Sequence, residues 1–150
     1  MATSSITSTI NHLAETIRAQ IKFKPRVAII LGTGLNCLTE FIQNSKIISY
    51  QELSGWPIST APGHVGRLIA GFLEKQPVIV MQGRAHFYEG YSMEQITLPV
   101  RVMQQLGVEI LIVTNAAGAI NPDFAPGDVM LITDHLGLIS MAGLNPLIGP

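Results

Sequence analysis

Three short apolar runs, at residues 27–31, 78–81 and 109–114, most constrain how this chain can fold. Nearly uninterrupted apolar runs of this length are typical of strands that a parallel sheet buries on both faces. A glycine or an asparagine lies within two positions of the end of each run and marks the point where each strand stops. The sequence therefore predicts buried strands whose ends lead directly into polar turns.

The remaining pattern predicts helices and a hairpin around these strands. Apolar residues recur every three or four positions in the first segment and predict one helix face, made of Ile6, Ile10, Leu13, Ile17 and Ile21. Residues 68–73 and 78–81 flank a short turn and predict a hairpin. Ser92, with Gln95 three positions later, predicts the start of a second long helix, within which Pro99 would introduce a kink or delay the start. With further strands at 47–50 and 127–133, this alternation predicts an α/β fold with a mixed sheet.

Composition limits the classes of function. The chain of 150 residues fits one domain, and 47% hydrophobic against 13% charged residues suggests additional buried surface such as subunit contacts. A formal net charge of -1 gives no electrostatic case for binding nucleic acid or an anionic membrane. The single Cys37 leaves no internal disulfide, and no apolar run approaches the roughly 18 residues of a membrane span. We expect a cytoplasmic location.

The strongest candidate site follows the run at 78–81. Arg84 offers a planar fork of donors that suits an oxyanion such as phosphate. In an extended segment Arg84, His86 and Tyr88 would share a face, and Glu89 could orient His86 from behind. The alternative is a polar loop in which Arg84 and Glu89 form an exposed ion pair. We favour an anion site, with His86 and Glu89 as its catalytic pair.

Two other strand ends and one loop carry weaker signals. Thr33 lies between two glycines, which is compatible with a phosphate-binding turn or with an ordinary tight turn. Ala116, Ala117 and Gly118 would let a flat ligand approach the backbone, or reflect crowding after a strand. His64, in a Pro-Gly loop, either reaches the ligand or is exposed to solvent. We expect the three strand ends to converge at one edge of the sheet.

A dinucleotide-binding fingerprint is the rival interpretation of the first glycine turn. Gly32 and Gly34 match its first two positions, but Cys37 stands where a Gly or Ala allows close helix packing. The rival also leaves Arg84 and His86 unexplained, and we reject it.

Several of these segments together resemble one known family. They are Leu31-Gly-Thr-Gly-Leu35, Ala61-Pro-Gly-His-Val-Gly-Arg67, Met81-Gln-Gly-Arg-Ala-His-Phe-Tyr-Glu-Gly-Tyr91 and Val113-Thr-Asn-Ala-Ala-Gly118. Their order and spacing are similar to those of purine nucleoside phosphorylases of the trimeric type. The resemblance covers nearly everything after residue 25.

The resemblance implies a partly barrel-like mixed sheet flanked by helices and a homotrimer. It also implies a transferase of purine salvage that cleaves purine nucleosides with phosphate to free base and ribose 1-phosphate. No metal or organic cofactor is implied, because inorganic phosphate is a co-substrate. The family's site residues correspond to Thr33, His64, Arg84, His86 and Ala116 at the phosphate, Tyr88 at the ribose, and Ala116, Ala117 and Gly118 along the base. Thr33 stands where the family usually has Ser, which keeps the hydroxyl and adds a methyl group.

The family's chains are much longer than this one. We therefore expect residues 1–150 to be the N-terminal part of a single nucleoside phosphorylase domain whose C-terminal part, with the purine-recognising residues, is absent. On this interpretation the chain carries the phosphate half of the site and is inactive alone. The alternative is a non-catalytic phosphate- or nucleotide-binding module.

Overall fold

A five-stranded sheet with the order β2-β3-β4-β1-β5 forms the centre of the protein. The computed structural model describes residues 2–32, 34–60, 65–138 and 143–146. The strands are β1 (Val27–Leu31), β2 (Gln43–Ser49), β3 (Arg67–Leu73), β4 (Gln76–Gln82) and β5 (Ile110–Val113). Strand β1 runs parallel to β4 and β5, whereas β2 and β3 are antiparallel to their neighbours. The predicted mixed α/β sheet is confirmed, although the described strands form an open sheet and not a closed barrel.

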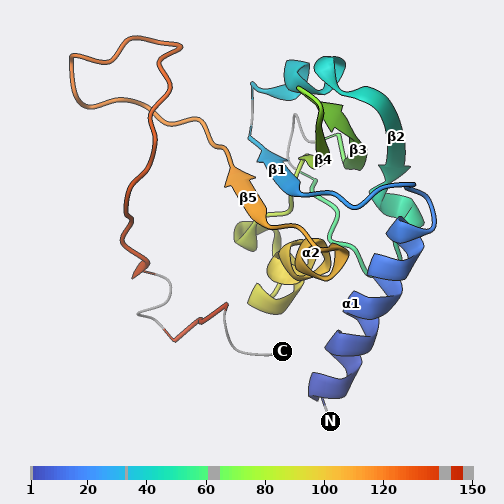
Figure 1. Ribbon diagram of the computed structural model, residues 1–150. Coiled ribbons are helices and arrows are strands. Elements are labelled where there is room, and N and C mark those ends of the chain that lie inside the picture. Colours follow the sequence, from blue (N-terminus) through green and yellow to red (C-terminus); the bar gives the residue numbers. More distant parts are fainter. Residues whose placement is uncertain (1, 33, 61–64, 139–142, 147–150) are drawn as a thin grey trace.

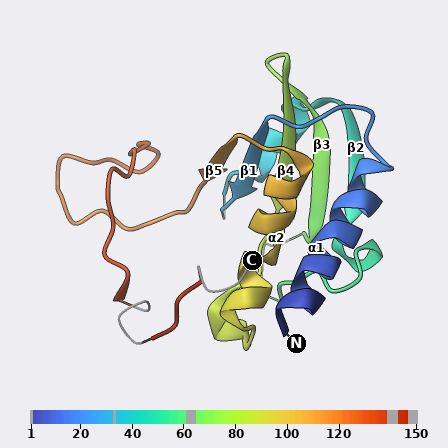
Figure 2. The same cartoon turned by 60° about the horizontal axis from the view of Figure 1, so that its bottom comes forward.

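Two helices, α1 (Ala2–Arg18) and α2 (Met93–Leu106), cover one face of this sheet, as Figures 1 and 2 show. All five residues of the predicted apolar stripe are buried in the larger core cluster, but only four of them lie on α1, because the helix ends at Arg18, before Ile21. That cluster also contains Val102 and Met103 of α2 and Ile79 of β4. Ser92 caps α2 by accepting a hydrogen bond from the backbone N–H of Gln95, and the helix continues through Pro99.

A smaller apolar cluster covers the opposite face of the sheet. Ile29, Ile69 and Val80 point into it from three neighbouring strands, together with Ile42. A 3-10 helix, η1 (Asn36–Phe41), lies beside this cluster and contributes the partly buried Leu38. Because η1 has only six residues, it does not provide the longer helix that a dinucleotide-binding turn leads into.

The prediction of a strand at 127–133 is wrong for this structure. Beyond β5 the chain leaves the body of the molecule as a long irregular loop, drawn orange to red in Figure 1. Residues 127–133 pair with no described strand, and Val129 and Leu131 are 96% and 87% exposed. An apolar run forms a strand only where a neighbouring strand satisfies its backbone groups, which the pattern alone does not supply.

Within the described ranges, no helix has the length and apolar character needed to cross a membrane.

Candidate phosphate-binding site

The carboxyl ends of β4, β1 and β5 meet at one edge of the sheet. These strands are adjacent and parallel, with Leu31 opposite Gln82 and Ile30 opposite Val113. The segments that follow them, at Gly32, Gly83 and Thr114, therefore lie side by side. The predicted convergence of the three strand ends is confirmed, and such an edge is where open α/β sheets bind ligands.

Thr114 connects these strand ends through both its side chain and its backbone. Its hydroxyl accepts a hydrogen bond from the Gly32 N–H at 2.8 Å and donates to the Ile30 carbonyl at 3.2 Å. Its own carbonyl accepts a hydrogen bond from Nη1 of Arg84 at 2.7 Å. A Cβ on Gly32 would lie only 2.6 Å from that carbonyl oxygen, so this approach requires glycine. Arg84 is thus fixed against β5.

Sequence reasoning missed Thr114, although one signal was available. A hydroxyl at the end of an otherwise apolar run is not needed for apolar packing. It can instead form hydrogen bonds with backbone groups where the pairing of two strands ends.

The turn that carries Arg84 is also held from behind by buried polar groups. The hydroxyl of Tyr50 donates to the Gly83 carbonyl at 2.7 Å, and burial raises the pKa of Tyr50 above its usual range. Nε of Arg67 donates to Oε1 of the buried Gln82 at 2.6 Å. The first contact joins residues 33 positions apart, and no periodic pattern indicates it; the second joins residues that lie opposite each other in the predicted hairpin of β3 and β4. They restrain the backbone immediately before Arg84.

Residues 87–89 form a 3-10 turn, η3 (Phe87–Glu89), and the prediction of an extended segment as far as Tyr88 is wrong. The reason is local, since Oε1 of Glu89 accepts a hydrogen bond from the backbone N–H of His86 at 2.7 Å and closes the turn. The rings of His86 and Tyr88 still lie together, stacked with centroids 4.8 Å apart and planes 14° apart. Tyr88 is 76% exposed and therefore accessible to a ligand.

Glu89 forms its ion pair with His86. The alternative, an exposed ion pair between Glu89 and Arg84, is not what the structure has. Oε1 of Glu89 lies 3.0 Å from Nδ1 of His86, and only 5% of the Glu89 side chain is exposed. Burial alone would raise the pKa of Glu89. Hydrogen bonds from the Thr60 N–H, the His86 ring, the His86 N–H and the Thr60 hydroxyl outweigh this effect and lower the pKa from 4.5 to about 2. The carboxylate is therefore ionised at neutral pH.

The remaining predicted site residues divide into two groups. Thr33 and His64 lie outside the described residues. Ala116, Ala117 and Gly118 directly follow the site edge in the irregular loop after β5 and are exposed. Ala117 and Gly118 line a hollow of about 640 Å³ enclosed by that loop, together with apolar side chains that include Phe124 and Met130.

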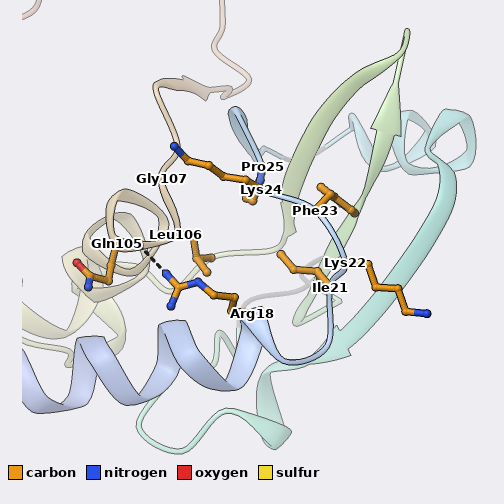
Figure 3. Close-up of a pocket in the computed structure, with 9 residues that line it drawn as sticks. All are labelled: Arg18, Ile21, Lys22, Phe23, Lys24, Pro25, Gln105, Leu106 and Gly107. Atoms are coloured by element: carbon orange, nitrogen blue, oxygen red, sulfur yellow. Dashed lines mark hydrogen bonds between the residues drawn. The ribbon is translucent and has the colours of Figure 1, made fainter.

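A second hollow, of about 680 Å³, lies at the opposite edge of the sheet, between the ends of α1 and α2 (Figure 3). Three cations line it, but their charged ends point in different directions. Arg18 donates to the Gln105 carbonyl at 2.9 Å, and the side chain of Lys24 lies against Gly107, which ends α2. Arg18 and Lys24 therefore complement the negative end of α2, as is favourable there. They do not converge on a shared anion.

Comparison with known proteins places the chain among phosphorylases. The model of the phosphorylase superfamily matches residues 26–150. Purine nucleoside phosphorylase 1 of Bacillus subtilis is 52% identical over 141 residues, which cover 94% of this chain and 51% of the relative. The purine nucleoside phosphorylase of Rattus norvegicus is 50% identical over 137 residues, covering 91% of this chain and 47% of the relative. The chain thus spans about half the length of the curated relatives it matches.

Solved structures agree in fold. A purine nucleoside phosphorylase in complex with ribose-1-phosphate superposes with a TM-score of 0.86 at 39% identity, covering 95% of this chain and 53% of that chain. The Schistosoma mansoni enzyme in complex with adenosine gives a TM-score of 0.86 at 39% identity, with coverage of 95% and 50%.

Proposed function

The chain belongs to the phosphorylase superfamily, and from this premise we propose that the protein cleaves purine nucleosides with inorganic phosphate. The products are the free purine base and ribose 1-phosphate. The observation that carries the proposal is the position of Arg84, which its contact with Thr114 fixes where three strand ends meet. Relatives named purine nucleoside phosphorylase, and solved relatives holding ribose-1-phosphate or adenosine, support this substrate class over a non-catalytic binding module.

In the proposed reaction the described residues mainly bind and orient phosphate. Arg84, His86 and the Ala116 N–H donate to it, and Thr33 and His64 are expected to add to them. An oxygen of phosphate attacks C1′ as the bond from C1′ to the base nitrogen breaks, and the departing base takes up a proton. The sugar passes through an oxocarbenium-like state, which the negative phosphate beneath it stabilises. Tyr88 is proposed to contact the ribose, and Ala116 to Gly118 the base. No metal or organic cofactor enters this scheme.

A trimeric assembly and a cytoplasmic location belong to the same proposal. The excess of apolar residues and the resemblance to trimeric phosphorylases support the trimer, and the single cysteine suits a reducing compartment. Light scattering at micromolar concentration should give three times the monomer mass for a form of the protein that spans the whole length of the curated relatives, here called the full-length protein. A monomer at that concentration would refute the assembly without affecting the proposed reaction.

The reaction is tested by following hypoxanthine release from inosine at varied phosphate concentration, using the full-length protein. Arg84→Ala should raise the KM for phosphate by roughly tenfold or more, because a hydrogen bond to a charged group is lost. Arg26→Ala is the matched control, since Arg26 forms an ion pair with Glu109 in which both side chains are 57% exposed. No phosphate-dependent release by the unaltered protein would refute the proposal, and equal phosphate saturation in both variants would refute the role of Arg84.

The 150-residue chain should show little turnover in the same assay. The proposed phosphate-binding residues lie within it, but it spans only about half the length of the curated relatives it matches. Losing one donor that stabilises the leaving group is expected to lower the rate by roughly a hundredfold or more. Turnover equal to that of the full-length protein would contradict this division of the site.

A further inference from the structure

Glu89 joins two segments that lie far apart in the sequence. One is its own turn, through His86, and the other is the loop at Ser59 and Thr60, about thirty positions earlier. Five groups make six contacts of 2.6 to 3.2 Å with its carboxylate, because the Ser59 hydroxyl reaches both oxygens; the His86 ring is one of the five groups. Such a number of donors fills the acceptor positions of one carboxylate.

The two oxygens of this carboxylate serve different partners. Oε1 accepts from the His86 N–H at 2.7 Å and lies 3.0 Å from its Nδ1. Oε2 accepts from the Thr60 N–H at 2.6 Å and from the Thr60 hydroxyl at 3.0 Å. The Ser59 hydroxyl lies between them, at 3.1 Å from Oε1 and 3.2 Å from Oε2. Thr60 therefore fixes the rotation of the carboxylate plane, and that plane determines where Oε1 meets the imidazole.

This arrangement constrains the chemistry of His86. An ionised carboxylate only accepts hydrogen bonds, so Nδ1 of His86 must carry a proton to donate to Oε1. In the neutral ring Nε2 is then the acceptor, and in the protonated ring it is a donor. Only 5% of the Glu89 side chain is exposed, so protein groups satisfy most of its acceptor positions.

We propose that Thr60 is a positioning residue of the phosphate site, which acts through Glu89 to fix the orientation and the Nδ1–H tautomer of His86. The part of this inference that concerns phosphate rests on the proposed function. The link from Thr60 to His86 stands on the hydrogen bonds alone. Thr60 itself is exposed, so its side chain has no packing role that would explain these contacts.

Thr60→Val, made in the full-length protein, tests this link. Valine keeps the branched shape and the backbone N–H but removes the hydroxyl that donates to Oε2. Thr60→Ser is the matched control because it keeps the hydroxyl. We expect Thr60→Val to raise the KM for phosphate by about fivefold, with a smaller change in kcat and no change in melting temperature, and Thr60→Ser to restore the original value.

Long-range ¹H–¹⁵N NMR of His86 provides a readout that does not depend on turnover. The unaltered protein and Thr60→Ser should show the Nδ1–H tautomer, and Thr60→Val should show a mixture of tautomers. An identical His86 spectrum and an identical KM for phosphate in both variants would overturn the inference. If the unaltered protein shows no phosphorolysis, the proposed function fails, whereas a change in the tautomer in Thr60→Val still supports the link to His86.

Discussion

Glu89 is nearly buried and still ionised, and this affects stability at acid pH. The pKa of Glu89 falls from its usual 4.5 to about 2 in the folded protein, so folding favours the ionised form. Its contribution to stability is therefore fully present above about pH 4.5 and is lost as the pH falls through about 2. Glu89→Gln should remove this dependence on pH.

Thermal unfolding at a series of pH values between neutral and strongly acid conditions measures the effect. The melting temperature of the unaltered protein should fall more steeply below pH 4.5 than that of Glu89→Gln. Glu40→Gln is the control, because Glu40 is exposed on η1 and its removal should leave the acid slope unchanged. Parallel curves for the unaltered protein and Glu89→Gln would contradict the assignment.

Tyr50 provides a second prediction at the scale of single residues. Its hydroxyl is buried and donates to the Gly83 carbonyl, one residue before Arg84. Tyr50→Phe leaves that carbonyl without its donor and should lower the free energy of unfolding by about 1–3 kcal/mol. In the control Tyr91→Phe the lost bonds, to the Ile58 carbonyl and from the Ile58 N–H, are exposed, so water can replace them and the loss should be smaller. Chemical denaturation measures both, and equal losses would show that burial of Tyr50 is unimportant.

Among the elements, strands and helices were predictable where a local pattern in the sequence indicates them. The apolar stripe of α1, the hairpin of β3 and β4, and the cap at Ser92 are local patterns, and all are present. The contacts of Glu89 with Ser59 and Thr60 were not predictable, because polar contacts between distant loops leave no period in a sequence. The prediction of a strand at 127–133 was wrong for a related reason, since an apolar run does not indicate which strand would pair with it.

The turn between β3 and β4 can be improved. Its two central residues, Glu74 and Lys75, have φ angles of 46° and 64°, the left-handed conformation that a two-residue type I′ turn requires. Side chains other than Asn, Asp or Gly adopt it at some energetic cost. Glu74→Asn with Lys75→Gly should therefore stabilise the protein by roughly 0.5–1 kcal/mol.

Thermal or chemical unfolding measures this gain, and Lys75→Ala is the control. Alanine removes the charge and the long side chain but keeps the Cβ, so it should give little stabilisation. A gain from Lys75→Ala as large as that from the double substitution would show that charge, and not backbone conformation, limits the turn.

On the scale of the whole molecule, the two edges of the sheet differ. Edge strand β2 has a register shift between Gln43 and Lys46 and carries polar residues along that stretch, features that discourage pairing with another chain. The other edge strand, β5, is regular and entirely apolar, and its four side chains are between 41% and 57% exposed. In the 150-residue chain β5 is therefore the edge at which self-association is expected.

The 150-residue chain should accordingly associate at micromolar concentration, and Ile112→Lys should reduce this association. A lysine on β5 places a charge where a second strand would have to bury it, and edge strands use lysine in this way. Ile120→Lys makes the same chemical change at a residue that is 100% exposed and lies off the sheet, so it should leave association unchanged. Sedimentation velocity distinguishes the two variants, because association through β5 should respond to Ile112→Lys and not to Ile120→Lys. If both lysines reduce the sedimentation coefficient equally, general surface hydrophobicity drives the association, and β5 has no special part in it.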